Sequence, residues 1–101
     1  MKRIWLEYAN QDMEEIYNYI YRDSPCYANV TRDKIINRTM DLSTFPYLGR
    51  KVQIFNDYNI RELIYKSYRI IYEIDSNIIY IHRIFHSARL FNKSNLKIKS
   101  K

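Results

Sequence analysis

Three apolar segments of strand length follow one another in the second half of the chain, at residues 60–65, 68–75 and 78–85. Only two residues separate each segment from the next, which is enough for a tight turn and too short for a helix. The stretch Asp75-Ser76-Asn77 has the residue types that such turns favour. We therefore expect the three segments to be consecutive antiparallel strands of one sheet.

Helical patterns dominate the first half of the chain. Residues 2–8 alternate between apolar and polar side chains and predict a first strand. Asn10 is expected to cap a helix that runs to about Arg22, because apolar residues recur there at helical spacing. Ser24-Pro25 is typical of the start of a second helix, which should end before Phe45-Pro46.

The order strand, helix, helix and then three or four strands predicts an α+β fold. The helical hairpin should pack on one face of an antiparallel sheet and leave the other face free. Residues 51–55 are either the fourth strand or an extended lead-in to the sheet. A chain of 101 residues supports one core, so we expect a single domain over residues 1–91, followed by a basic tail or short helix at residues 92–101.

Positive charge is concentrated in the second half of the chain. Residues 1–48 contain six Lys and Arg against seven Asp and Glu, a net charge of −1. Residues 49–101 contain eleven against four, a net charge of +7, and the two parts sum to the formal net charge of +6. Such asymmetry predicts an anionic partner, either a nucleic acid or an acidic protein.

Several kinds of site find no support in the sequence. Cys26 is the single cysteine and no Cys/His group has zinc spacing, so we expect no metal, no cofactor and a reducing cytoplasm. No Ser/His/Asp set, glycine-rich phosphate loop or carboxylate dyad has useful spacing. No apolar run approaches the roughly 20 residues that span a bilayer, which predicts a cytoplasmic protein without membrane contact.

Basic residues lie inside the predicted strands, at Arg61, Arg69 and Arg83. Arginine is rarely buried without a partner, so we expect the free face of the sheet to display cations that contact phosphate. The alternative is cross-strand ion pairing, for example of Arg69 with Glu62 or Glu73.

The last predicted strand contains or precedes both histidines of the chain. His82 is expected to pack inside the structure. His86 follows the strand, where it is either a general acid or an ordinary hydrogen-bonding residue. The sequence leaves both readings of His86 open.

These features, taken in order, resemble a known family. The second half contains Gly49-Arg50, Ile60-Arg61-Glu62-Leu63, Tyr68-Arg69-Ile70-Ile71-Tyr72 and a strand followed by His86-Ser87-Ala88-Arg89. The first half contains a strand with a Trp, a Ser-Pro junction, a second helix ending at Phe45-Pro46, and a first helix with Asp12, Ile16, Tyr19 and Ile20. The chain resembles the RelE/ParE superfamily of toxins from bacterial type II toxin–antitoxin modules.

The resemblance implies the small α+β fold of that superfamily and a growth-inhibiting toxin. It also implies a cognate antitoxin as partner, whose acidic, partly disordered segment would suit the half with a net charge of +7. RelE-like members cleave mRNA on the ribosome, with the 2′-hydroxyl as nucleophile, and leave a cyclic phosphate. ParE-like members poison DNA gyrase and have no nuclease activity.

For a RelE-like nuclease the resemblance implies roles for particular residues. Arg69 would hold the scissile phosphate, and His86 would be the acid that protonates the leaving oxygen. The other expected site residues add charge or stack on a base: Arg61 and Arg89 in transition-state stabilisation, Phe91 in base stacking, and Arg83 and Lys66 in substrate binding.

The target of the toxin stays open at the level of sequence. The pair of strand lysines and the C-terminal Tyr of RelE itself have no clean counterparts here. We expect a ribosome-dependent endoribonuclease that binds the ribosome and mRNA. Two alternatives remain: a gyrase poison without nuclease activity, and a non-toxic relative that binds its antitoxin and represses its operon.

Overall fold

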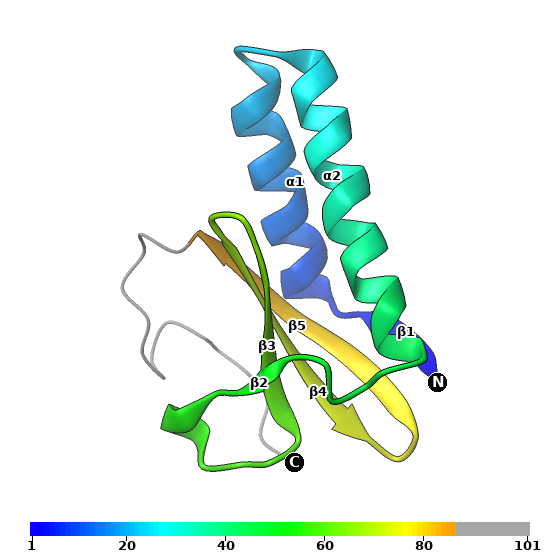
Figure 1. Cartoon of the computed structure of the whole chain (residues 1–101). Coiled ribbons are helices and arrows are strands. Elements are labelled where there is room, and N and C mark those ends of the chain that lie inside the picture. Colours follow the sequence, from blue (N-terminus) through cyan, green and yellow to red (C-terminus); the bar gives the residue numbers. More distant parts are fainter. Residues whose placement is uncertain (87–101) are drawn as a thin grey trace.

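Two long helices precede most of a five-stranded sheet (Figure 1). The structure is a computed structural model, and it describes residues 1–86. Its elements, in chain order, are β1 Lys2–Trp5, α1 Glu7–Tyr21, α2 Pro25–Met40, η1 Asp41–Ser43, β2 Arg50–Lys51, η2 Gln53–Phe55, β3 Ile60–Tyr65, β4 Tyr68–Asp75 and β5 Ile78–His86, where η marks a short 3₁₀ turn.

The strands lie in the order β1-β5-β4-β3-β2. Neighbours from β2 to β5 are antiparallel, whereas β1 pairs with β5 in parallel, so that Lys2 lies opposite Ile78 and Trp5 opposite Ile81. The predicted α+β fold is confirmed. The sheet is mixed because two helices follow β1 in the chain. No tight turn joins β1 to a neighbouring strand, so no β-hairpin fixes the direction of this edge strand.

The first strand is shorter than the sequence predicts, and α1 begins earlier. Leu6 donates its N–H to the Ile81 carbonyl at 3.0 Å, and the Leu6 carbonyl accepts from the N–H of Asn10 at 3.1 Å. Leu6 therefore ends the ladder and opens the first helical turn. The prediction that Asn10 caps the helix is wrong: Leu6 occupies the N-cap position, and Tyr8, expected in the strand, is half exposed on the helix.

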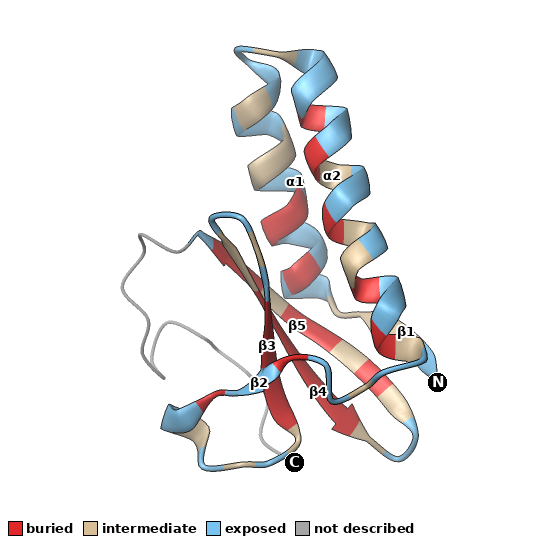
Figure 2. Ribbon diagram, in the orientation of Figure 1, coloured by how far each residue is buried: buried red, intermediate tan, exposed pale blue. Residues whose placement is uncertain are grey.

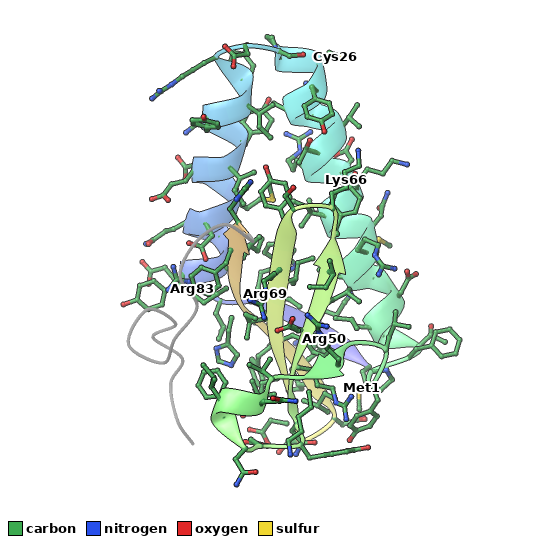
Figure 3. All side chains as sticks on the ribbon, turned by 60° about the vertical axis from the view of Figure 1, so that its left-hand side comes forward. Met1, Cys26, Arg50, Lys66, Arg69 and Arg83 are labelled. Atoms are coloured by element: carbon green, nitrogen blue, oxygen red, sulfur yellow. The ribbon has the colours of Figure 1, made fainter. Side chains whose placement is uncertain are left out.

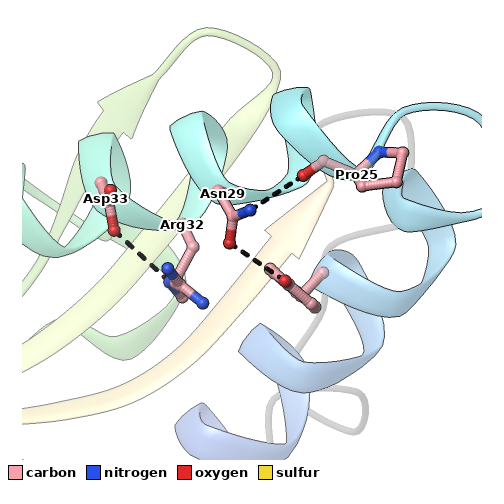
Figure 4. Close-up of polar contacts among 5 residues, drawn as sticks. Pro25, Asn29, Arg32 and Asp33 are labelled. Atoms are coloured by element: carbon pink, nitrogen blue, oxygen red, sulfur yellow. Dashed lines mark hydrogen bonds and ion pairs between the residues drawn. The ribbon is translucent and has the colours of Figure 1, made fainter.

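The second helix begins and ends as predicted. The Ser24 hydroxyl accepts a hydrogen bond from the N–H of Tyr27 at 3.1 Å, and Pro25 is the first helical residue. The two helices are tied near their junction, where Tyr17 donates to the side-chain oxygen of Asn29 at 3.0 Å and Asn29 donates to the Pro25 carbonyl at 3.1 Å (Figure 4).

The main core lies between the helical hairpin and one face of the sheet, here called the helix face (Figure 2). Side chains alternate along β4, so that Ile70, Tyr72 and Ile74 all join this core. The core contains buried residues from both helices and from three central strands: Ala9, Met13, Ile35, Leu42, Leu63, Ile70, Tyr72, Ile74, Ile79, Ile81 and Ile84.

The opposite face of the sheet, here called the open face, has a small apolar cluster of its own. Val52, Ile60, Ile71 and Phe85 are buried there, and Phe55 of η2 packs against them. The expectation of a free face studded with cations is therefore only partly met. Part of this face is a second, smaller core, because strands with apolar residues on both sides need cover on both sides.

A β-bulge in β5 changes which side chains share a face. Tyr72 pairs with Ile81 and Ile71 pairs with Arg83, so His82 is an extra residue without a Cα partner in β4. Strict alternation would place Ile81 and Arg83 on one side of the sheet, whereas the bulge places them on opposite sides. His82 is buried, as predicted, and its Nε2 lies 2.8 Å from Oε1 of Glu73.

Candidate functional site

Arg69 and His86 lie on opposite faces of the sheet. In the β4–β5 ladder Tyr68 pairs with His86 and Arg69 pairs with Phe85. Residues paired in a ladder point to the same side, so Arg69 joins Phe85 on the open face and His86 joins Tyr68 on the helix face. The expectation that both residues share one exposed face is wrong, and the structure does not bring them together.

On the open face, Arg69 is paired with a buried carboxylate. Its Nη2 donates to Oε2 of Glu62, and the Nε of Arg50 donates to Oε1 of the same carboxylate at 3.0 Å. Glu62 is 2% exposed, Arg69 21% and Arg50 71%. The alternative of cross-strand ion pairing between Arg69 and Glu62 is confirmed.

These three charged residues line a pocket of about 340 Å³ on the open face. Figure 3 shows Arg69 of β4 and Arg50 of β2 close to each other, with β3 between the two strands. We call this the cationic pocket, and its lining is Arg50, Lys51, Val52, Gln53, Ile54, Glu62 and Arg69.

Arg61, expected as a surface cation, is a buried structural residue on the helix face. It lies opposite Tyr72 in the β3–β4 ladder and is 8% exposed. Its guanidinium donates to the Gly49 carbonyl at 2.7 Å and lies 4.9 and 4.5 Å from the ring centroids of Tyr47 and Tyr58. Arg61 therefore holds the loop before β2 against the sheet.

Arg83 is held by α1 at the edge of β5. Its Nε and Nη2 donate to the Asp12 carboxylate at 2.7 and 3.0 Å, and the N–H of Ile84 donates to the same carboxylate at 2.9 Å. Beyond Ile81, β1 no longer covers this edge of β5. Asp12 therefore satisfies the backbone where the strand pairing ends, which is a structural role for Arg83 and Asp12.

His86 lies in a second hollow of about 460 Å³, between α1 and the ends of β4 and β5. Its ring meets that of Tyr68 edge-on, with centroids 5.6 Å apart. Burial, and then the neighbouring phenols of Tyr27 and Tyr19, raise the pKa of the Tyr68 hydroxyl above its usual 10.0. We call this the aromatic groove, and its lining is Asp12, Glu15, Ile16, Tyr19, Ile20, Tyr68, Ile84 and His86.

The family described as "ParE toxin of type II toxin-antitoxin system, parDE" matches residues 3–91. The chain belongs to the ParE toxin family. A solved structure described as "Chromosomal ParDE TA system from P. aeruginosa" shares the fold, with a TM-score of 0.72 and 21% sequence identity. The match covers 85% of this chain and 95% of the other. Comparison with curated protein sequences gave no match.

Family membership makes this ParE chain a toxin of a type II toxin–antitoxin system and supports a cognate antitoxin as its partner. The similarity to the ParDE structure extends over nearly the whole of that chain and shows that the ParE fold is preserved. The predicted superfamily is confirmed. Membership in the family does not by itself say whether the toxin acts on gyrase or on the ribosome.

Of the remaining predicted site residues, Lys66 is described by the structure and lines neither pocket of the ParE toxin. Lys66 lies in the β3–β4 turn, at the far end of that hairpin from Arg50 (Figure 3), with Nζ 5.8 and 5.7 Å from the ring centroids of Tyr27 and Tyr65. Arg89, Phe91 and the basic segment 92–101 lie outside the described residues. Their predicted roles stay predictions.

Two features of the ParE toxin bear on cofactors and membranes. In residues 1–86 no group of three or more His, Cys, Asp or Glu is arranged to hold a metal ion. Over the same range, neither helix combines the length and the apolar content that bilayer crossing requires. Cys26 is exposed at the start of α2.

Sequence reasoning missed Arg50 and Asp12 as parts of the two pockets. Arg50 could have been singled out from the sequence, because Arg50-Lys51 is an adjacent basic pair directly after the single glycine of the chain. Asp12 was visible only as an acid in the first turns of a helix. Its bond to Arg83 joins residues 71 positions apart, which no local pattern encodes.

Proposed function

We propose that this ParE-family toxin inhibits growth by poisoning DNA gyrase and does not cleave mRNA. The observation that carries the proposal is the placement of Arg69 and His86 on opposite faces of the sheet. Membership in the ParE family supports the same choice, because ParE-like members are the gyrase poisons of the superfamily.

The separation matters because the nuclease chemistry needs both residues at one phosphate. A general acid acts only within hydrogen-bond reach of the leaving oxygen, about 3 Å, or through one water. A phosphate held by Arg69 lies on the open face, and the β-sheet stands between it and His86. In this arrangement His86 has no path to the leaving oxygen.

The charge around Arg69 is a second argument against the nuclease. Glu62 is buried beside the guanidinium and uses both carboxylate oxygens, one for Arg69 and one for Arg50. A scissile phosphate at Arg69 would meet this negative charge in a region of low solvent exposure, where repulsion is weakly screened. The catalytic roles of Arg69 and His86 stay predictions of the nuclease alternative.

Induction of the chain in bacteria, without an antitoxin, tests the proposal. We expect growth arrest with filamented cells and induction of a DNA-damage reporter, while translated mRNAs keep their normal lengths. Depletion and internal cutting of translated mRNA, without the damage response, would contradict the proposal and favour the nuclease. Normal growth on soluble, induced chain would leave only the non-toxic relative.

A further inference from the structure

Arg61 carries a buried positive charge that no carboxylate of the described chain neutralises. The residue is 8% exposed, and among residues 1–86 it forms no ion pair. Its Nε donates to the Tyr58 carbonyl at 3.1 Å and its Nη1 to the Gly49 carbonyl at 2.7 Å. Nη2 donates to no atom of residues 1–86 and is not fully buried, so a ligand can reach it. Such a charge attracts an anion from outside the chain, because it is weakly screened.

Two tyrosine rings flank this guanidinium and remain largely in solvent. Tyr47 is 48% exposed and Tyr58 is 61% exposed. Their ring centroids lie 5.3 Å apart, with 37° between the ring planes, and the Arg61 guanidinium lies over both rings. Since Arg61 covers one face of the Tyr58 ring while most of that residue is exposed, the opposite face is open to solvent. An open ring face beside a cation suits a flat aromatic group that carries negative charge.

Lys51 adds a second cation on the same side of the sheet. It pairs with Arg61 in the β2–β3 ladder, so the two side chains point to one side. Lys51 is exposed and also forms no ion pair within residues 1–86. The one acid in the adjoining loop at residues 56–59 is Asp57, which accepts the N–H of Asn59 at 2.9 Å. Two positive charges against one negative charge leave a local surplus.

The loops that carry the two rings are fixed in place by hydrogen bonds. The Tyr72 hydroxyl accepts from the N–H of Gly49 at 2.9 Å, two residues after Tyr47. Arg61 then joins this loop to the next one, because it donates to carbonyls of both Gly49 and Tyr58. Binding of a ligand therefore orders little of the chain, which favours affinity.

We infer that Tyr47, Tyr58, Arg61 and Lys51 form a binding site for single-stranded nucleic acid, here called the tyrosine site. A base stacks on the open face of the Tyr58 ring. The adjoining phosphate accepts from Nη2 of Arg61 and from the ammonium of Lys51. A duplex covers its base faces by stacking, so the site selects an unpaired strand. The inference goes beyond the proposed target, because this binding requires neither gyrase nor the ribosome.

Fluorescence anisotropy with the full chain and a labelled oligothymidine of about ten nucleotides tests the inference. We expect Tyr58→Ala to weaken binding about tenfold, because stacking is lost, and Tyr58→Trp to retain binding, because it keeps a flat ring. Lys51→Ala leaves both rings in place. It should weaken binding and make the salt dependence shallower, because one phosphate contact is lost.

The matched control is Tyr21→Ala on the helical hairpin. Tyr21 is 49% exposed and lies beside Tyr17, with ring centroids 5.7 Å apart and 35° between the ring planes. The cation over the Tyr17 ring is Arg32, which is paired with Asp33 at 3.4 Å. This tyrosine pair therefore has similar geometry but a neutralised cation, and we expect its loss to leave oligothymidine binding unchanged.

Three results with oligothymidine would overturn the inference. These are no binding by the wild type, equal affinity of the wild type and Tyr58→Ala, and an equal loss in Tyr21→Ala. A duplex that binds as tightly as the single strand would also overturn it, since the base faces are then hidden. A glutamate-rich peptide that binds more tightly, with the binding lost in Tyr58→Ala, would replace the nucleic acid by a protein partner. Circular dichroism confirms that each variant is folded, and every variant retains the basic segment 92–101.

Discussion

At the scale of single residues, Tyr72 joins the loop before β2 to the sheet. Its ring is fully buried, and its hydroxyl donates to the Pro46 carbonyl at 2.8 Å and accepts from the N–H of Gly49 at 2.9 Å. Gly49 has no room for a side chain, because a Cβ there would lie 2.5 Å from the Glu62 carbonyl. The Tyr72 hydroxyl and the close approach at Gly49 therefore fix this loop together with Arg61.

Replacing Tyr72 by Phe should lower the free energy of unfolding by about 1–3 kcal/mol, because the buried N–H of Gly49 and carbonyl of Pro46 lose their partner. Urea denaturation measures the change. The matched control is Tyr80→Phe on β5, which removes a hydroxyl from a less buried ring. An equal effect of the two substitutions would show that the Tyr72 hydrogen bonds contribute nothing specific.

The same residue should give the fold a dependence on alkaline pH. Burial raises the pKa of the Tyr72 hydroxyl above its usual 10.0, so the folded state favours the neutral phenol. The stability from this shift is fully present below pH 10 and is lost as the pH rises through the folded-state pKa. Urea denaturation across this range should show a shallower decline for Tyr72→Phe than for the wild type. Identical slopes would contradict the assignment.

At the scale of elements, β5 decides the arrangement of both faces. Its bulge at His82 reverses the alternation, and its uncovered edge is completed by Asp12 from α1. The strands at residues 60–65 and 68–75 were predictable because alternation and short turns are local signals. The bulge and the Asp12–Arg83 pair depend on contacts between residues far apart in the sequence. Local patterns therefore predicted the strands of the sheet but wrongly placed His86 and Arg69 on one face.

Asp12→Ala should destabilise the fold by about 3 kcal/mol, since it removes two hydrogen bonds from the nearly buried Arg83 guanidinium and one from the Ile84 N–H. Thermal and urea denaturation measure the loss. Glu14→Ala, on an exposed position of the same helix, is the control and should change stability little. A comparable loss in both variants would mean that helix charge, and not the edge contact, is responsible.

A smaller effect is expected at the start of α2. Ser24→Ala removes the acceptor for the N–H of Tyr27 and should lower the free energy of unfolding by about 1 kcal/mol. Ser67→Ala, at an exposed position of the β3–β4 turn, serves as the control. Unchanged stability of Ser24→Ala would show that the N-cap bond is replaced by water without loss.

At the scale of the whole molecule, a small ParE fold separates two unlike surfaces by one sheet. The helix face carries the aromatic groove with His86, and the open face carries the cationic pocket with Arg69. The arginine content of the strands predicted a cationic open face, and this prediction is only partly met. Arginine content could not show that Glu62 neutralises part of this surface, or that Arg61 and Arg83 serve the fold.

The reaction of the purified toxin with gyrase and with translating ribosomes tests the central claim most directly. Two reactions run in parallel: gyrase with relaxed plasmid and ATP, and ribosomes translating a defined mRNA. Our account predicts loss of supercoiling with gyrase-linked DNA breaks in the first reaction and intact mRNA in the second. Cleaved mRNA beside unaffected gyrase, with cleavage abolished by Arg69→Ala and by His86→Gln alike, would contradict it.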